Sequence, residues 1–174
     1  MVRVERYGKG QDAGDVSAGD FILAHRHHFL AALISQAQRR RFRGDQSVYA
    51  HWSHCALVET STSLIEAEID GVVRSPLSKY RSDEYHLVRV DLDPIARERA
   101  VGYARAQVGQ AFGFLDMFGA SLYLLTGRPV RMVRANHEIC SSLVVRALQQ
   151  GGLLNELDPA LTLPADLAKA FDVR

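Results

Sequence analysis

The chain's 174 residues fit one domain and are enough to bury a hydrophobic core without disulfides or a structural metal. Hydrophobic residues make up 47% of the chain and charged residues 24%, which is the composition of a globular protein rather than a disordered or membrane-embedded one. Because 21 basic residues nearly balance 20 acidic ones, the net charge gives no reason to expect nucleic acid or an anionic membrane as a partner.

The N-terminal stretch MVRVERYGKGQDAGD mixes charge with glycine and holds no apolar run long enough for a signal sequence or a transmembrane helix. We therefore expect a protein without integral membrane association, cytoplasmic by default, with signal-independent export or virion association left open. Residues 1–18 are expected to form an arm or loop, and residues 19–174 a single domain. Cys55 and Cys140 make neither a disulfide framework nor a CxxC metal pair, which favours a reducing compartment.

Alternating and helical hydrophobic patterns divide the rest of the chain into strands and helices. The polar stretch TSTS joins two strands into a predicted hairpin that Gly71 closes, and Asp93-Pro94 starts a helix, with Asp as the N-cap. Strands are expected at residues 19–25, 53–59, 64–70 and 84–92, and helices at 29–43, 94–108, 114–127 and 140–150, with a short helix or surface turn at 163–171. Helices and antiparallel strands that segregate along the chain predict an α+β fold.

Cys140 lies at the predicted start of the helix in ANHEICSSLVVRALQQGG. The unpaired N–H groups and the positive dipole end of a helix N-terminus favour a thiolate over a thiol, and the thiolate is the reactive form. A free cysteine on the apolar side of a helix is also commonly a buried packing residue. Cys140 alone therefore leaves both interpretations open.

His54 and Glu66 supply the partners that a cysteine nucleophile needs. A cysteine hydrolase requires an imidazole to take the thiol proton and a third polar group to orient that imidazole. His54 begins one strand of the predicted hairpin and Glu66 follows it by 12 residues, on the returning strand. If Ser61 and Thr62 form the tip, the two side chains lie close together on one face. Taken singly, His54 could be a half-buried strand residue and Glu66 a solvated carboxylate.

The order of GDFILAH, SHCALVE, LIEAEIDGVVRSPLSKY, VRVDL, GYARAQVGQAF and ICSSLVVRALQQGG resembles the circularly permuted NlpC/P60 cysteine hydrolases. This papain-like group includes the YiiX-type proteins and, more distantly, lecithin:retinol acyltransferase, and the match runs from residue 19 to residue 152. Histidine before cysteine is the mark of the permutation. The resemblance implies a permuted papain-like fold, with an antiparallel sheet or small barrel packed against helices. It also implies Cys140 as nucleophile, His54 as base and Glu66 as the orienting group.

The chain departs from the family after its long helix. Many relatives have Gly-x-x-Tyr-Asp where this sequence has GQAFG, which ends at residue 113, so the phenol and the carboxylate are missing. That segment usually lies near the substrate cleft, and we expect Phe112 to line the cleft together with His51 and Trp52. His51 is also the rival of His54 for the role of base.

Other polar features have simpler interpretations. His25, His27 and His28 in HRHH lie too close together to close a tetrahedral metal site, so we expect them to line a cleft or the surface and expect no metal or cofactor. The run RRRFR is expected to be a solvated helix end. Cys55 alternates with His54 along the strand and is expected in the core.

These residues together predict a cysteine peptidase or amidase that cleaves an amide bond through a thioester on Cys140. Its partner would be a peptide, a peptidoglycan-like or an acyl substrate, and the backbone N–H of Cys140 would help to hold the oxyanion. A lipid-directed acyltransferase or thioesterase of the same fold is the first alternative. A catalytically silent binding or structural module is the second.

Overall fold

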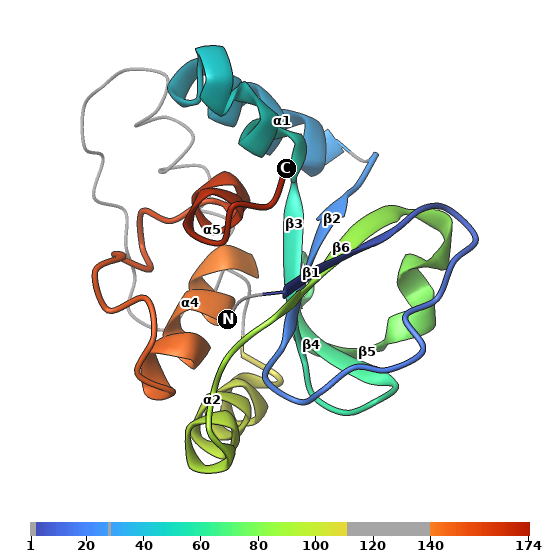
Figure 1. Cartoon of the computed structure of the whole chain (residues 1–174), viewed down its shortest axis with the longest axis vertical. Coiled ribbons are helices and arrows are strands. Elements are labelled where there is room, and N and C mark those ends of the chain that lie inside the picture. Colours follow the sequence, from blue (N-terminus) through green and yellow to red (C-terminus); the bar gives the residue numbers. More distant parts are fainter. Residues whose placement is uncertain (1–2, 28, 111–139) are drawn as a thin grey trace.

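The computed structural model describes residues 3–27, 29–110 and 140–174, which form an α+β fold (Figure 1). Six strands make one antiparallel sheet in the order β1-β6-β2-β3-β4-β5, with β1 and β5 at its edges. The strands are β1 (Arg3–Tyr7), β2 (Phe21–His25), β3 (His54–Val58), β4 (Ser63–Glu68), β5 (Gly71–Pro76) and β6 (Glu84–Arg89). The α-helices are α1 (Phe29–Arg41), α2 (Pro94–Gln107), α4 (Cys140–Gln150) and α5 (Pro164–Ala170), and the 3-10 helices are η1 (Gly44–His51) and η2 (Leu77–Ser82).

The two faces of the sheet are covered by different elements. Helices α2, α4 and α5 lie on one side, where side chains such as Leu57 of β3 pack against them (Figure 1). The next side chain along β3, Val58, points to the other face and packs with Leu77 and Tyr80 of η2. Consecutive residues of β3 therefore face opposite sides of the sheet, and this alternation decides which side chains can meet at the site. Among the described residues, no helix is long and apolar enough to cross a membrane.

The predicted strands and most predicted helices are confirmed, with small differences at their ends. Asp93 caps α2 as expected, its Oδ1 accepting a hydrogen bond of 2.8 Å from the backbone N–H of Ala96. The segment 163–171 contains a helix, α5, rather than a surface turn. The helix expected at residues 114–127 falls outside the described residues.

Two predictions about strands are wrong. Residues 1–18 are not simply an arm or loop, because Arg3–Tyr7 forms β1 and pairs antiparallel with β6. Gly71 does not end the strand region either. It begins β5, which runs back along β4 in the register Ser63↔Pro76 to Glu68↔Gly71. A turn of only Ile69 and Asp70 separates β4 from β5. The polar and glycine residues of this turn are as typical of a strand end as of a second hairpin, so the sequence pattern did not indicate β5.

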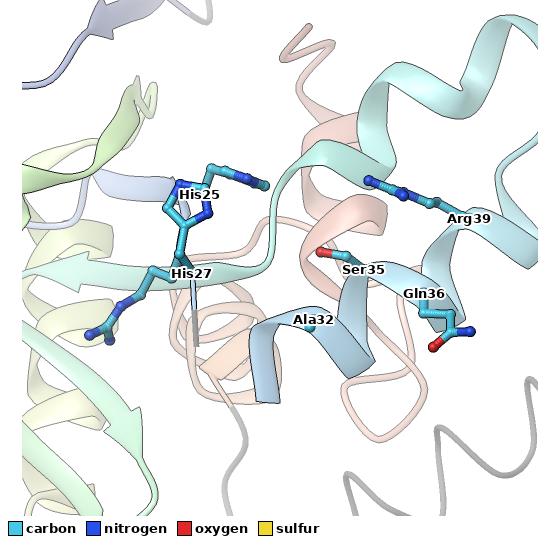
Figure 2. A pocket seen from close by; sticks show the side chains of 7 residues that line it. His25, His27, Ala32, Ser35, Gln36 and Arg39 are labelled. Atoms are coloured by element: carbon cyan, nitrogen blue, oxygen red, sulfur yellow. The ribbon is translucent and has the colours of Figure 1, made fainter. Parts of the chain in front are cut away.

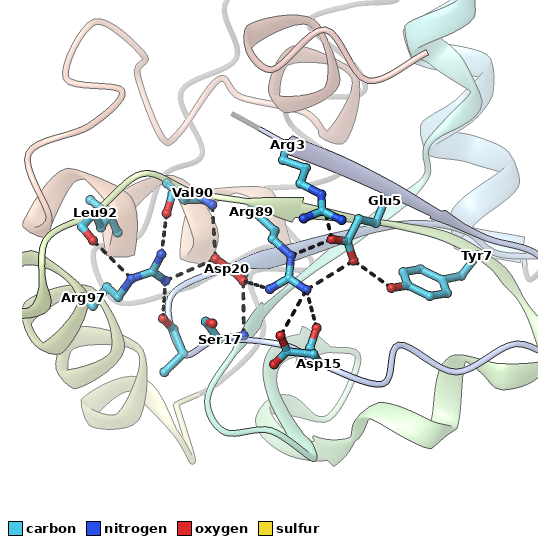
Figure 3. Close-up of polar contacts among 11 residues, drawn as sticks. Arg3, Glu5, Tyr7, Asp15, Ser17, Asp20, Arg89, Val90, Leu92 and Arg97 are labelled. Carbon is cyan, nitrogen blue, oxygen red and sulfur yellow. Dashed lines mark hydrogen bonds and ion pairs between the residues drawn. The ribbon is translucent and has the colours of Figure 1, made fainter. Parts of the chain in front are cut away.

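Asp20, the residue just before β2, has a structural role (Figure 3). Asp20 is fully buried, and its carboxylate accepts hydrogen bonds from the backbone N–H groups of Ser17 (3.2 Å) and Val90 (3.1 Å). It also forms ion pairs with Arg97 of α2 (3.2 Å) and Arg89 of β6 (3.5 Å). One carboxylate therefore joins the entry to β2, the end of β6 and helix α2.

Candidate active site

His54 and Glu66 lie in contact, as the hairpin predicts. The Nε2–H of His54 donates a hydrogen bond of 2.8 Å to Oε2 of Glu66. The β3–β4 register pairs Leu57 with Ile65, so His54 and Glu66 are diagonal neighbours on the same face of the sheet. Glu66 is fully buried and His54 is 6% exposed, so Glu66 is not the solvated carboxylate that its alternative interpretation required.

Cys140 is the first residue of α4 and lies against β3. Its thiol interacts with the His54 ring and with the thiol of Cys55, and these interactions shift the pKa values of all three groups. Because Nε2 of His54 is bound to Glu66, Nδ1 is the ring nitrogen that remains for Cys140. Cys55 is buried in the core as expected, and in addition it contacts the candidate nucleophile. Cys140 itself is 6% exposed and Cys55 is not exposed at all.

The electrostatics of the site favour a thiolate beside an imidazolium. The hydrogen bond from Cys55 holds the pKa of the Cys140 thiol well below its usual range; burial works against this, and the hydrogen bond and charge of His54 add to the lowering. Burial lowers the pKa of His54, but its hydrogen bonds to Cys140 and Glu66 outweigh burial and raise that pKa to about 9. The opposite directions of the two pKa shifts favour the ion pair, with the proton on His54 and the negative charge on Cys140.

Glu66 stays ionised in this buried place. Burial raises the pKa of a carboxyl group, but the hydrogen bond and charge of His54 and the hydrogen bond from Lys79 lower the pKa of Glu66 well below its usual range. A charged Glu66 orients the imidazole and stabilises its protonated form.

Sequence reasoning missed two residues of this cluster, Lys79 and Tyr80 of η2. Lys79 Nζ lies 2.6 Å from Glu66 Oε1, and the Tyr80 hydroxyl donates to Glu66 Oε2. Burial and the charge of Glu66 raise the pKa of Tyr80 well above its usual value, so Tyr80 remains a hydrogen-bond donor. The two residues belong to the stretch SPLSKY, which spans the end of β5 and the first part of η2. No role was assigned to it because β5 itself was not foreseen.

The same cluster contains a group of residues that could hold a metal ion. Ligand atoms of His54, Glu66 and Glu68 all lie within 4.8 Å of one another. The ammonium group of Lys79 lies between the two carboxylates, 2.6 Å from Oε1 of Glu66 and 2.6 Å from Oε1 of Glu68. The Lys79 ammonium group thus holds the position between the two carboxylates that a metal ion would take. Because this position is filled, the residues as arranged do not fit a metal.

Among the described residues that were expected to line a cleft, His51 and Trp52 have contacts outside the cluster of Cys140, His54 and Glu66. His51 Nε2 contacts Glu84 Oε2 at 3.1 Å, and its ring stacks on His25 with centroids 4.2 Å apart. Its contacts are thus with the β2 and β6 ends, whereas Cys140 is bonded to His54. Trp52 is 1% exposed and donates from Nε1 to the backbone oxygen of Val173, which makes it a core residue that anchors the C-terminal segment. Phe112, His137, Glu138 and His28 lie outside the described residues.

A pocket of about 670 Å³ opens between α1 and the end of β2 (Figure 2). It is lined by polar and cationic side chains, and Ser35 and Arg39 project from α1 toward the end where His25 and His27 lie. Cys140 and His54 do not line it. Arg26 connects the pocket with the cluster around Glu66, because Arg26 lines the pocket and its Nη1 lies 2.6 Å from Glu68 Oε1.

The described geometry therefore joins a thiol, an imidazole, a carboxylate and an ammonium group in one buried chain of contacts, from α4 through β3 and β4 to η2. A scan against protein-family models and a search of curated proteins gave no match to this chain.

Proposed function

We propose that this protein is a cysteine hydrolase with a permuted papain-like fold related to the NlpC/P60 enzymes, in which Cys140 is the nucleophile, His54 the general base and acid, and Glu66 the orienting group. One observation carries the proposal. The Nε2 of His54 lies 2.8 Å from the carboxylate of Glu66, and the same ring interacts with the thiol of Cys140, which contributes to the raised pKa of His54. Three polar groups in this order are the arrangement that activates a thiol.

The first half of the reaction uses the charge separation already present. The Cys140 thiolate attacks the carbonyl carbon of an amide or ester, a C–S bond forms, and the carbonyl oxygen becomes an oxyanion. The backbone N–H of Cys140 stands in the first turn of α4 and is a donor for this oxyanion. The imidazolium of His54 then gives its Nδ1 proton to the leaving nitrogen or oxygen, the scissile bond breaks, and a thioester on Cys140 remains.

The second half regenerates the thiolate. Water attacks the thioester while neutral His54 takes the proton of that water, and the tetrahedral intermediate collapses with loss of the C–S bond. The acid leaves, and the imidazolium and thiolate are restored. Glu66 keeps its charge throughout and holds Nε2 of His54, so that Nδ1 faces the reacting atoms. The substrate class is an amide or ester carbonyl of a peptide or acyl compound, and an amine or alcohol in place of water turns hydrolysis into acyl transfer.

Alkylation of the folded protein tests this proposal. We expect iodoacetamide at pH 7 to modify Cys140 faster than Cys55, and His54→Ala to slow the Cys140 reaction by about tenfold or more, because the thiolate loses its cation. His51→Ala is the matched control, since His51 contacts Glu84 rather than Cys140, and its rate should equal that of the parent chain. Peptide mapping by mass spectrometry gives the rate at each thiol.

The chemical step is tested with p-nitrophenyl acetate. A burst of nitrophenolate and an acetyl group on the Cys140 peptide are the expected results, and both should be lost in Cys140→Ser. Equal, slow alkylation of both thiols together with no acetyl adduct would refute the proposed function.

A further inference from the structure

We infer that Lys79 is a positioning residue of the site. Its ammonium group fills the cation position formed by His54, Glu66 and Glu68, where it fixes the Glu66 carboxylate and keeps metal ions away from His54. The filled cation position is a property of the cluster itself, whereas the positioning role rests on the proposed function.

The geometry around Lys79 is that of a bound cation. Nζ lies 2.6 Å from a carboxylate oxygen of Glu66 and 2.6 Å from one of Glu68, and Oγ of Ser75 lies 3.5 Å away. An ammonium group has three donors, and these three oxygens are its acceptors. The Lys79 side chain is 29% exposed and the Glu66 side chain is not exposed at all, so the lysine reaches inward from η2 to a carboxylate that water does not contact.

The charges of the cluster explain why a cation must be there. Negative charges in and beside a buried site carry a large free-energy cost unless they have counter-ions. Arg26 lies 2.6 Å from Oε1 of Glu68, and His54 contacts Oε2 of Glu66. With the Cys140 thiolate, the two carboxylates make three negative charges, and Lys79 adds the third positive charge to those of Arg26 and protonated His54.

The two oxygens of Glu66 have separate partners. Oε1 is bonded to Lys79, whereas Oε2 accepts from His54 and from the Tyr80 hydroxyl. Lys79 thus fixes the rotation of the carboxylate from one oxygen while the other serves the imidazole. This division is the physical basis of the positioning role.

A covalently attached cation has an advantage over a metal ion at this point. A metal held by His54, Glu66 and Glu68 would take Nε2 of His54 as a ligand, and the remaining Nδ1–H of the metal-bound ring is a much weaker acid than an imidazolium and leaves no basic nitrogen for the reaction. Because charged Lys79 has no lone pair and contacts carboxylate and hydroxyl oxygens, it supplies positive charge and leaves both nitrogens of the imidazole free of a metal.

The cation position is tested with Zn²⁺ in a chain carrying Cys140→Ser, so that the nucleophile's thiol contributes no ligand. We expect Lys79→Met, or Lys79→Gln if the methionine variant does not fold, to bind one Zn²⁺ at least tenfold more tightly than the Cys140→Ser parent by calorimetry. Co²⁺ should show d–d absorption in the same variant. Lys79→Arg keeps the charge and Lys169→Met removes a lysine elsewhere, so neither should gain affinity, and adding Glu68→Gln to Lys79→Met should abolish the gain.

The positioning role is tested in the chain that keeps Cys140, with a chelator present. Lys79→Met should slow alkylation of Cys140 several-fold, and Lys79→Arg should restore most of the rate. If Lys79→Met binds Zn²⁺ no more tightly than Lys169→Met, the inferred cation position is wrong. If Lys79→Met leaves the alkylation rate of Cys140 unchanged, the positioning role is wrong. If Cys140 is unreactive in the parent chain, the proposed function fails while the Zn²⁺ result still decides the cation position.

Discussion

At the scale of single residues, the site depends on how burial and hydrogen bonding oppose each other. Burial disfavours the charged form of every member, yet each charged group has a partner that compensates. His54 is the clearest case, because burial lowers its pKa and the bonds to Cys140 and Glu66 still raise it to about 9. The imidazole is thus protonated at neutral pH because of its two neighbours and not because it is exposed to water.

The raised pKa of His54 sets the alkaline limit of activity. The imidazolium must give a proton to the leaving group, so kcat/KM for an ester or amide should fall as pH rises through about 9, the pKa of His54 in the folded protein. A pH profile of p-nitrophenyl ester hydrolysis measures this limit. A descending limb centred near the ordinary histidine pKa of about 6.5 would contradict the arrangement.

Cys55 should tune the nucleophile. Its hydrogen bond is the largest cause of the lowered pKa of Cys140, so Cys55→Ala should raise that pKa and slow alkylation of Cys140 at pH 6 by several-fold. Cys55→Ser, which keeps a donor, should lie much closer to the parent chain. The measurement is the pH dependence of the iodoacetamide rate at Cys140, and identical curves for the alanine and serine variants would show that the thiol of Cys55 has no electrostatic effect.

At the scale of secondary structure, the elements with a clear hydrophobic periodicity were predictable, whereas β5, which a two-residue turn joins to β4, was not. Helix α4 buries Leu143, Val144 and Leu148, as its pattern indicates. Strands β3 and β4 also follow their pattern, which is why the pairing of His54 with Glu66 could be expected. Strand β5 escapes this kind of prediction because a glycine after a strand indicates the end of a sheet region as readily as a second tight turn.

Missing β5 had a consequence for the site. Without β5, the stretch that follows it has no fixed place relative to β4, so contacts from Lys79 and Tyr80 to Glu66 could not be foreseen. Contacts between side chains of separate elements depend on the register and the turns that join them. The burial of Trp52 was missed for a similar reason, since its partner Val173 comes from the far end of the chain.

The N-cap of α2 offers a test at this scale. Asp93→Ala removes the acceptor for the Ala96 N–H and should lower the free energy of unfolding by about 1 kcal/mol, whereas Asp93→Asn keeps an acceptor and should cost clearly less. Urea denaturation followed by circular dichroism gives both values. A loss in the alanine variant no larger than in the asparagine variant would mean that the cap contributes little.

At the scale of the whole molecule, a few buried polar side chains join helices to the sheet and to each other. Asp20 joins β2, β6 and α2, and Gln38 of α1 bonds the backbone oxygen of Trp52 at 2.8 Å and the N–H of Ala165 at 2.9 Å. Both side chains are fully buried. Each therefore connects segments that are distant in the sequence, which the hydrophobic pattern alone does not specify.

Removing the Asp20 carboxylate should show its importance. Asp20→Ala removes the acceptor of two backbone N–H groups and the buried negative charge that faces Arg97 and Arg89, and we expect a loss of about 3 kcal/mol in the free energy of unfolding. Asp15→Ala is the matched control, because the Asp15 side chain is 91% exposed and reaches Arg89 only at 4.0 Å. Equal urea midpoints for the two variants would contradict the role assigned to Asp20.

The order of residues in the site has a consequence for how the protein folds. His54, Glu66, Lys79 and Tyr80 all come from the continuous segment β3-β4-β5-η2, whose antiparallel strands join through short turns, while Cys140 arrives on α4 from much later in the chain. The aligned imidazole therefore depends on contacts with small sequence separation, which form early because little loop-closure entropy opposes them. We therefore expect the docking of α4 on β3 to complete the site last, and recovery of a reactive Cys140 during refolding should report that long-range contact.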